Sequence, residues 1–364
     1  MSRVSTPARE ADLTALLGES GFTEEPVNHL DEHQVRDLLR EHYALDVDLR
    51  RLPTEKDDTF RAATDEASWT VKISAASEAP NLISLQTEAM IWAGAHMSAE
   101  GPPVPRVLRT TTGAATVSLT DDPSQSQRYP RVLRVLEFLP GVPIGSDDAP
   151  KLDGAAMERL GGACACLAES LNGFNHPADS RRLAWDLAEL PTLAPLTQHL
   201  NGQDLDLTKQ SLNEFAHYAW PAIADMRWQV EHNDFNPFNV LVGNGARIAG
   251  VIDFGDVVRT AAILNTSVAA GSMIDLDARG WWLVERFVSG YQSVCPISDT
   301  ELQVLAVAAP ARQAQRILLR GLASAQSPER AAYLASHATD LVTPLTRVLD
   351  MSVDDRVESL RALR

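Results

Sequence analysis

The spacing of hydrophobic and polar positions changes twice along the 364-residue chain. Residues 1–27 are polar and mixed, which predicts a loosely attached lead-in. Apolar residues then recur every three to four positions, which predicts a helix that Asn28 or Asp31 can cap. From about residue 47 the pattern alternates and is broken by turn residues, as in a sheet. Three short strands are expected there, at 47–53, 59–63 and 68–73.

The remainder of this half adds a helix and a further pair of strands. Residues 81–98 carry one apolar face at helical spacing. Strands are predicted at 115–119 and 129–138, with the polar loop 120–127 between them. A Pro- and Gly-containing turn at 139–143 ends the sheet-rich region.

The second half is helical apart from one strand-like island, residues 230–256. Alanine-rich helical segments are predicted at 153–173, 207–227, 277–294, 300–325 and 328–349. The pattern therefore predicts an α+β chain in two lobes. The expected division is a lead-in over 1–27, a small lobe with an antiparallel sheet and one helix over 28–137, and a larger, mostly helical lobe over 138–364.

Polar residues of the island stand at the ends of its two predicted strands. Asp234 and Asn239 lie five positions apart, just before the apolar strand 240–242. Asp253 follows the second apolar strand, 249–252, and enters a glycine turn. A β-hairpin would bring the three side chains to one end of the strands. Oxygen ligands that include a carboxylate suit Mg²⁺, an ion that bridges substrate phosphates.

The order of these residues matches a known reaction chemistry. The pattern H-x-D-x-x-x-x-N, followed 14 residues later by Asp-Phe-Gly, is typical of the catalytic and metal loops of protein-kinase-like phosphotransferases. We expect Asp234 to accept the hydrogen bond of an attacking hydroxyl, and Asn239 and Asp253 to hold metal ions against nucleotide phosphates. His232 is expected to bond the backbone of the loop rather than take part in the chemistry.

This chemistry predicts a phosphate-binding lysine in the first half. Such a lysine lies on a strand and pairs with a glutamate of the next helix. Lys72 is in the predicted strand 68–73, and Glu88 is in the following helix; Glu78, in a loop, is the alternative. The chain has no G-x-G-x-x-G loop. Either the turn at 53–60 covers the phosphates, with Thr54 contributing its hydroxyl, or it is an ordinary exposed hairpin.

Composition narrows the classes of partner. With 32 Lys+Arg against 49 Asp+Glu, the net charge of −17 argues against binding to nucleic acid or to an anionic membrane. Cys164, Cys166 and Cys295 are too few and too poorly spaced for a zinc site or a disulfide framework. The chain shows no signal peptide and no apolar run long enough to span a membrane, so a cytoplasmic location is expected.

These motifs resemble the aminoglycoside phosphotransferase and choline-kinase-like small-molecule kinases, and among them the hydroxylysine-kinase branch. The resemblance covers about residues 30–350 and implies a bilobal protein-kinase-like fold with nucleotide in the cleft. The segments that carry the closer match are LPTEKDDTF at 52–60, VPRV at 104–107, LPG at 139–141, WDL at 185–187 and GVIDFGD at 250–256.

The resemblance implies a hinge at Glu137, Phe138 and Leu139, whose backbone would bind the purine of ATP or GTP. Arg259, unexpected beside the metal loop, would either bind an acidic group of the acceptor or pair with a local carboxylate. Asn265 stands where relatives commonly have an acidic residue. Other candidates for acceptor recognition are Asp186, Asp256, Trp281, Trp282, Glu285 and Tyr291.

The predicted function is Mg²⁺-dependent transfer of the γ-phosphoryl group of ATP or GTP to a hydroxyl of a small acceptor, such as a hydroxylated amino acid or amino alcohol. One alternative is an antibiotic phosphotransferase for an aminoglycoside, macrolide or nucleoside-type acceptor, which a broad acidic cleft would favour. A narrow cleft with an arginine clamp for a carboxylate favours the first. Another alternative is a catalytically silent nucleotide-binding regulator. A monomer or a homodimer is expected.

Overall fold

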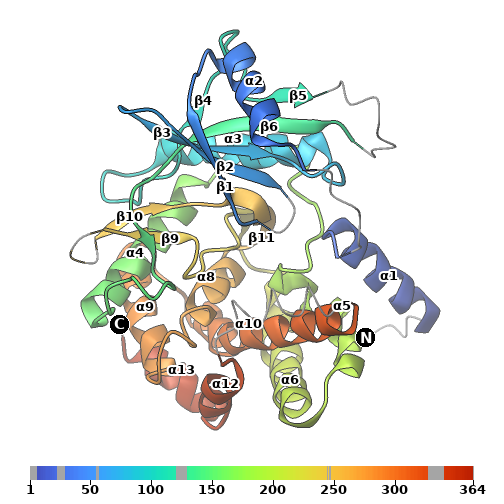
Figure 1. Ribbon diagram of the computed structural model, residues 1–364. Helices are drawn as coiled ribbons and strands as arrows, with labels where there is room; N and C mark the ends of the chain where they lie inside the picture. The colour runs from blue at the N-terminus through green and yellow to red at the C-terminus, as the bar shows by residue number, and fades with distance from the viewer. Residues whose placement is uncertain are drawn as a thin grey trace.

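The computed structural model describes residues 6–22, 29–54, 57–119, 129–243, 245, 247–326 and 340–363. Figure 1 shows a small sheet-rich lobe above a larger helical lobe, which confirms the predicted α+β fold. The strands are β1 Asp48–Leu52, β2 Asp58–Ala63, β3 Ser68–Ile73, β4 Val107–Leu108, β5 Val117–Leu119, β6 Arg131–Glu137, β7 Val142–Pro143, β8 Trp228–Glu231, β9 Val240–Val242, β10 Ile248–Val251 and β11 Val258–Ala261. The helices are α1 Thr6–Glu19, α2 Glu32–Tyr43, α3 Pro80–His96, α4 Gly154–Ser170, α5 Leu190–Leu193, α6 Gly202–Glu214, α7 Trp220–Ile223, α8 Ala262–Gly271, α9 Trp281–Gln292, α10 Asp299–Gln326, α12 Val342–Leu349 and α13 Val353–Arg361. Short 3-10 helices lie at Leu187–Glu189, Ala194–His199 and Phe254–Asp256, and a π-helical turn lies at Phe215–Ala219.

The small lobe is built on an antiparallel sheet that the described residues form in the order β1-β2-β3-β6-β4, with β5 also paired to β6. The three predicted strands at 47–53, 59–63 and 68–73 are confirmed as β1, β2 and β3. In this register Lys72 of β3 lies opposite Thr59 of β2 and Arg134 of β6. Asp31 caps α2, as predicted, in a capping box with Gln34.

The lead-in is attached more firmly than the sequence predicts. Residues Thr6–Glu19 form helix α1, which Figure 1 shows beside the larger lobe. The side chains of Leu13 and Leu16 are buried in the core of that lobe. Ser20 accepts a 2.7 Å hydrogen bond from the backbone of Ala184, and Arg182 forms an ion pair with Asp12. The expectation of a loosely attached segment is therefore wrong for the described part of residues 1–27.

Helix α3 connects the two lobes through a shared core. Its buried residues Leu85, Ala89 and Ala93 belong to the hydrophobic cluster of the larger lobe. A separate cluster fills the space between the sheet and α2. Since α3 follows directly on β3, its packing against α4 positions the strand that carries Lys72 relative to the larger lobe.

The island in the helical half forms the predicted hairpin. Strands β9 and β10 pair antiparallel, with Val251 opposite Val240, and β7 joins the other side of β9. The chain therefore enters the larger lobe a few residues after β6 ends. This pairing supports a lobe boundary near residue 138, which stays a prediction. The predicted loop 120–127 and residues 328–339 of the predicted helical segment 328–349 lie outside the described residues.

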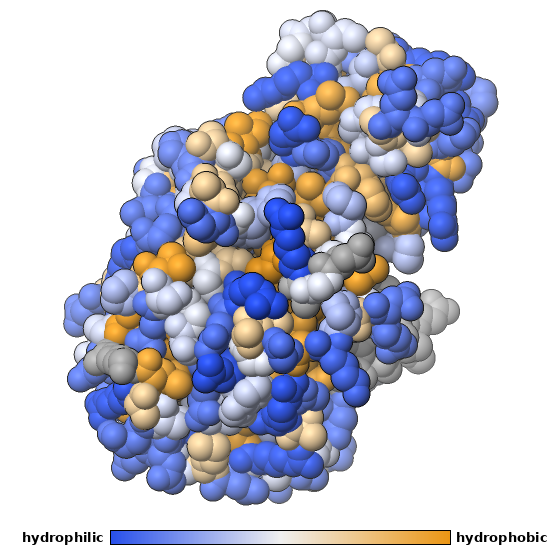
Figure 2. Space-filling view, turned by 90° about the vertical axis from the view of Figure 1, so that its left-hand side faces the viewer, coloured by the Kyte–Doolittle hydropathy of each residue, from blue (hydrophilic) through white to orange (hydrophobic). Residues whose placement is uncertain are grey.

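The surface is mostly hydrophilic on the face that Figure 2 shows, and the molecule narrows between the lobes.

The described part of the chain contains no helix that is both long and apolar enough to cross a membrane. Cys164 and Cys166 are buried in α4, as predicted, whereas Cys295 is only partly buried.

Helices α4 and α9 approach each other closely at Gly161 of α4 and Gly290 of α9. This contact gives a stability prediction. A Cβ atom at Gly161 would overlap the Phe287 carbonyl, whereas at Gly162 it would lie 3.6 Å from its nearest neighbour, the Gly290 oxygen. We expect Gly161→Ala to lower the free energy of unfolding by about 2 kcal/mol, measured by denaturant titration. Gly162→Ala is the matched control and should change it by less than about 0.5 kcal/mol. Equal effects would contradict the close approach.

Candidate active site

The loop between β8 and β9 is held by side chains that bond its backbone. The ring of His232 lies 3.2 Å from the Ile252 carbonyl through Nε2, and its Nδ1 accepts the Asp234 N–H at 3.3 Å. Burial lowers the pKa of His232 to about 4, so the ring is neutral and can donate at one nitrogen while it accepts at the other. Asn233 has a positive φ of 60°, and its N–H donates to Asn265 at 3.0 Å. His232 thus has the backbone-bonding role that we expected.

The carboxylate of Asp234 is surrounded by hydrogen-bond donors. Its Oδ1 accepts from Asn236 at 2.8 Å and from Arg312 at 3.3 Å. Its Oδ2 accepts from Asn239 at 2.6 Å. Burial, together with the charge of Asp256, raises the pKa of Asp234 to about 7, and the charge of Arg312 opposes this rise. The carboxylate is thereby held in one orientation, and its pKa lies near neutral pH. Both properties suit a group that accepts a proton.

Lys72 of the small lobe and Asp253 of the larger lobe lie in contact. Asp253 has a left-handed backbone (φ 64°), and its Oδ1 accepts from the Gly255 N–H at 3.2 Å and from Lys72 at 3.3 Å. The charge of Lys72 lowers the pKa of Asp253. Burial alone would lower the pKa of Lys72, but the charges of Asp253 and Asp57 outweigh it and raise that pKa. Both groups are therefore charged near neutral pH.

Two oxygens are suited to a hard divalent cation. Asn239 uses its amide nitrogen on Asp234, and Asp253 receives both of its donors at Oδ1. Asn239 Oδ1 and Asp253 Oδ2 accept no hydrogen bond from the residues that the structure describes. The two loops are fixed side by side by a 2.9 Å bond from the Ile252 N–H to the Asn239 carbonyl. This donor set, an amide oxygen and an ionised carboxylate, fits Mg²⁺.

The structure does not bring Glu88 to Lys72. Its carboxylate, 55% exposed, accepts from Ser84 at 2.7 Å and lies 4.0 Å from His176. Within the described chain the ion pairs of Lys72 are with Asp253 and, at 3.9 Å, with Asp57. The expected pairing is therefore absent, because Ser84, one helical turn before Glu88 on α3, holds the carboxylate on the exposed side of the helix. Gln86, on a different side of α3, instead bonds Glu78 at 2.7 Å.

The predicted nucleotide contacts are only partly placed. The hydroxyl of Thr54 donates to the Asp57 carbonyl at 2.6 Å, and residues 55–56 of the same turn lie outside the described chain. In the hinge, the N–H of Glu137 donates to the Arg106 carbonyl at 2.8 Å and that of Phe138 to the Ser68 carbonyl at 3.2 Å. Leu139 N–H has no backbone acceptor among the described residues. Among the three predicted hinge residues, Leu139 is thus the one whose N–H has no backbone acceptor in the described chain.

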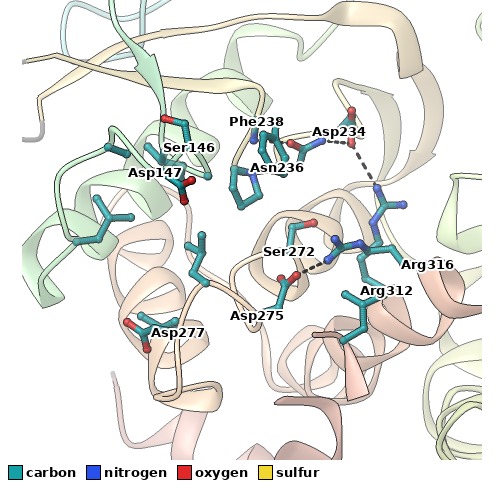
Figure 3. A pocket seen from close by; sticks show the side chains of 18 of the residues that line it. Ser146, Asp147, Asp234, Asn236, Phe238, Ser272, Asp275, Asp277, Arg312 and Arg316 are labelled. Atoms are coloured by element: carbon teal, nitrogen blue, oxygen red, sulfur yellow. Dashed lines mark hydrogen bonds and ion pairs between the residues drawn. The ribbon is translucent and has the colours of Figure 1, made fainter. Parts of the chain in front are cut away.

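Next to Asp234 lies a cavity of about 740 Å³ in the larger lobe. Figure 3 shows it between the segment with Ser146 and Asp147 on one side and the arginines of α10 on the other. Asp256, one of the predicted acceptor residues, lines it. Its charged lining residues are Asp147, Lys151, Asp234, Asp256, Asp275, Asp277, Arg279, Arg312, Arg316 and Arg320.

Two other predicted acceptor residues do not reach this cavity. Asp186 is 5% exposed and caps the turn Leu187–Glu189, accepting from the Ala188 N–H at 3.0 Å and from Thr260 at 2.9 Å. Burial raises its pKa to about 6. Arg259 pairs with Asp179 at 2.7 Å, so of its two predicted roles the pairing with a local carboxylate is confirmed. Both residues hold the loops behind the site.

The aromatic candidates on α9 pack elsewhere. Trp281 is buried and donates to Ser359 at 2.9 Å, and Tyr291 is buried in the core. Trp282 is exposed beneath the guanidinium of Arg279. The α9 residue that does line the cavity is Leu283, whereas Glu285 is not in its wall.

Sequence reasoning missed Arg312, which contacts the carboxylate of Asp234. Its guanidinium lies 4.9 Å from the Trp185 ring centroid and donates to the Trp185 carbonyl at 3.1 Å and to Gln315 at 2.8 Å. Arginines at 312, 316 and 320 share one face of α10, whose buried positions are mostly apolar. Arginines at this spacing on a mostly buried helix could have pointed to Arg312. A charged side chain is buried only when it is paired, so a carboxylate partner is expected nearby.

We expect Arg312 to act as a positioning residue, and a pH profile tests it. Asp234 accepts a proton only when ionised, so kcat/KM should fall as the pH drops through its pKa. Arg312→Gln removes a charge that lowers this pKa. The acid limb of the plot of kcat/KM against pH should therefore move to higher pH by about one pH unit. Arg316→Gln should leave the limb in place. A lower rate at every pH with an unmoved limb would contradict the role.

The arrangement of a lysine on a strand of one lobe, a base on a loop of the other and a carboxylate–amide pair between them defines a kinase-like phosphotransferase. The chain belongs to the phosphotransferase enzyme family, whose model matches residues 48–264.

Individual relatives support this assignment. Hydroxylysine kinase of Danio rerio is 26% identical over 353 residues, which is 92% of this chain and 95% of that protein. Hydroxylysine kinase of Mus musculus is 24% identical over 83% of this chain and 85% of that protein. Among solved structures, the microcompartment-associated aminopropanol kinase superposes with a TM-score of 0.67 at 19% identity, covering 92% of this chain and 99% of that one. An AMP-bound spectinomycin phosphotransferase gives 0.60 at 13% identity, with 89% and 99% covered. These two structures support the assignment of the fold.

Proposed function

We propose that this protein is a Mg²⁺-dependent small-molecule kinase that transfers the γ-phosphoryl group of ATP or GTP to a hydroxyl of a small hydroxylated amino acid or amino alcohol. The observation that carries the proposal is the placement of Asp234. Its carboxylate stands in the wall of the acceptor-sized cavity and next to Asn239. The relatives named hydroxylysine kinase and aminopropanol kinase support the class of acceptor.

In the proposed reaction, Asp234 accepts a hydrogen bond from the acceptor hydroxyl and orients its oxygen toward the γ-phosphorus. The new P–O bond forms while the bond between the γ-phosphorus and the bridging oxygen breaks. The nucleoside diphosphate leaves, and the hydroxyl proton passes to Asp234. Asn236, Asn239 and Arg312 keep the carboxylate oriented, so that reaction depends mostly on positioning and charge neutralisation.

Residues of both lobes would hold the donor. Lys72 would bind donor phosphates from the small lobe, and Asn239 and Asp253 would hold Mg²⁺ from the larger lobe. When bound, the metal ion neutralises charge on the phosphate oxygens. The Leu139 N–H would donate to the purine. Support for the lysine and carboxylate roles comes from the 3.3 Å contact between the two side chains, one from each lobe.

The test is a transfer assay with purified protein, Mg²⁺ and either ATP or GTP. Hydroxylysine, aminopropanol and spectinomycin are offered separately, and phosphorylated product is identified by ³¹P NMR and mass spectrometry. We expect turnover with hydroxylysine or the amino alcohol, and none when Mg²⁺ is chelated. Tight nucleotide binding without transfer to any acceptor would overturn the proposal and favour a silent regulator. Turnover with spectinomycin alone would favour an antibiotic phosphotransferase.

A further inference from the structure

The cavity next to Asp234 has one wall formed by a row of arginines on α10. We call Arg312, Arg316 and Arg320 the arginine row. Because they are four positions apart, they lie on one face of the helix, and each is about 6 Å further along the axis than the one before. All three line the cavity. Arg312 contacts Asp234, so the row leads away from the reacting group.

Arg316 is held in place but keeps unused donors. Its Nη1 bonds Asp275 at 2.8 Å and Gln313 at 3.0 Å. Asp275 is itself held by Gln313 at 3.2 Å. Neither Nε nor Nη2 of Arg316 donates a hydrogen bond to any described residue, and its side chain is 22% exposed. Figure 3 shows Arg316 and Asp275 facing the cavity beside Ser272.

The two unused nitrogens match a carboxylate. Adjacent N–H groups of a guanidinium bind both oxygens of a carboxylate side by side, which fixes geometry as well as charge. An exposed arginine would lose such a contact to solvent competition, but Arg316 lies inside a cavity and its orientation is set by Asp275. The contact would therefore be selective for an anion in one position.

Charge in the cavity also separates the acceptor classes. Five carboxylates and five cationic side chains line it, although the whole chain carries a net charge of −17. A polycationic acceptor such as an aminoglycoside would gain from a surplus of carboxylates, which this wall lacks. A balanced lining suits an acceptor with both charges. On the wall opposite the row, Asp147 makes no hydrogen bond or ion pair with the described residues and is available to an ammonium group.

We propose that Arg316 binds the carboxylate of the acceptor and that the protein therefore selects amino acids bearing a side-chain hydroxyl over amino alcohols. The inference rests on the proposed function and names its acceptor class. Arg316 begins about 6 Å further along the axis of α10 than Arg312, whose side chain contacts Asp234. A hydroxyl several bonds away from the carboxylate can thus reach Asp234 while the carboxylate stays on Arg316.

The test compares two acceptors that differ only in the carboxylate: hydroxylysine and the amine obtained when its carboxyl group is replaced by hydrogen. Wild-type protein should prefer hydroxylysine in kcat/KM by at least about tenfold. Arg316→Gln should raise the KM for hydroxylysine about 10- to 100-fold, the cost of one charged hydrogen-bonded contact, with kcat little changed. The KM for the amine should stay within about twofold. Arg316→Lys should recover part of the loss.

The control is Arg361→Gln, which removes the same charge from the exposed face of α13 and should leave both KM values unchanged. Equal losses for the two acceptors in Arg316→Gln would show a structural role only and would overturn the inference. If that variant does not fold, a wild-type protein that uses the amine as well as hydroxylysine overturns it equally. In both of these cases the proposed kinase function stands. Absence of turnover with either acceptor overturns the function and the inference together.

Discussion

Asp234→Asn is expected to reduce phosphoryl transfer by about 10³-fold, the usual effect of losing a general base. Asparagine has the same size and can still bond one of its neighbours, but it cannot take the proton of the hydroxyl. Nucleotide affinity should change by less than about threefold, because Asp234 faces the acceptor cavity. Single-turnover kinetics and isothermal titration calorimetry with Mg²⁺ and nucleotide measure the two effects separately.

The matched control for this variant is Asp225→Asn, at an exposed position beyond α7, which should retain full activity. Thermal unfolding of each variant checks that the fold is kept. Transfer within tenfold of wild type in Asp234→Asn would remove Asp234 from the role of base. The acceptor proton would then have to go to another group.

Asp253→Asn is expected to have the second large effect, on the donor side. Asparagine tolerates the left-handed backbone that Asp253 adopts, so the turn should be kept while the negative charge is lost. We expect affinity for the Mg²⁺–nucleotide complex to fall at least tenfold and transfer to fall at least 10²-fold. The reason is that the variant loses the charge that attracts the metal and that pairs with Lys72.

Metal dependence distinguishes this effect from a general loss of structure. In the presence of a chelator, wild type and Asp253→Asn should bind nucleotide with affinities within about threefold. Nucleotide binding is titrated at several Mg²⁺ concentrations, and the variant should need a higher concentration for half-maximal binding. An unchanged Mg²⁺ requirement would exclude Asp253 as a ligand.

The hairpin of β9 and β10 could be predicted from sequence because its signals are local. Asp234, Asn239 and Asp253 flank two short apolar strands, and a hairpin of that spacing can close in only a few ways. Lys72 was recognisable for the same reason, since it lies in a strand whose pattern sets its register. The structure places Lys72 and Asp253 in contact although 181 positions separate them in the chain.

Which group each side chain contacts in the folded chain could not be decided from the sequence. Glu88 has the right position in sequence but is held by Ser84 on the exposed side of α3. Asp186 and Arg259 have suitable chemistry for binding an acceptor. Asp186 instead caps a turn, and Arg259 instead forms an ion pair with Asp179. In each case a nearer group competes for the side chain, and sequence spacing does not show which one is nearer in space.

The sequence by itself determined the two-lobe α+β fold, the hairpin that carries Asp234, Asn239 and Asp253, and the strand that carries Lys72, because hydrophobic period and short motifs encode structure within about 20 residues. Only the tertiary structure decided what faces the acceptor. Arg312 and Arg316 reach Asp234 and its cavity from a helix more than 70 positions further along the chain. Such a contact follows from how α10 packs against the rest of the lobe, and the local pattern around these arginines predicts only a helix.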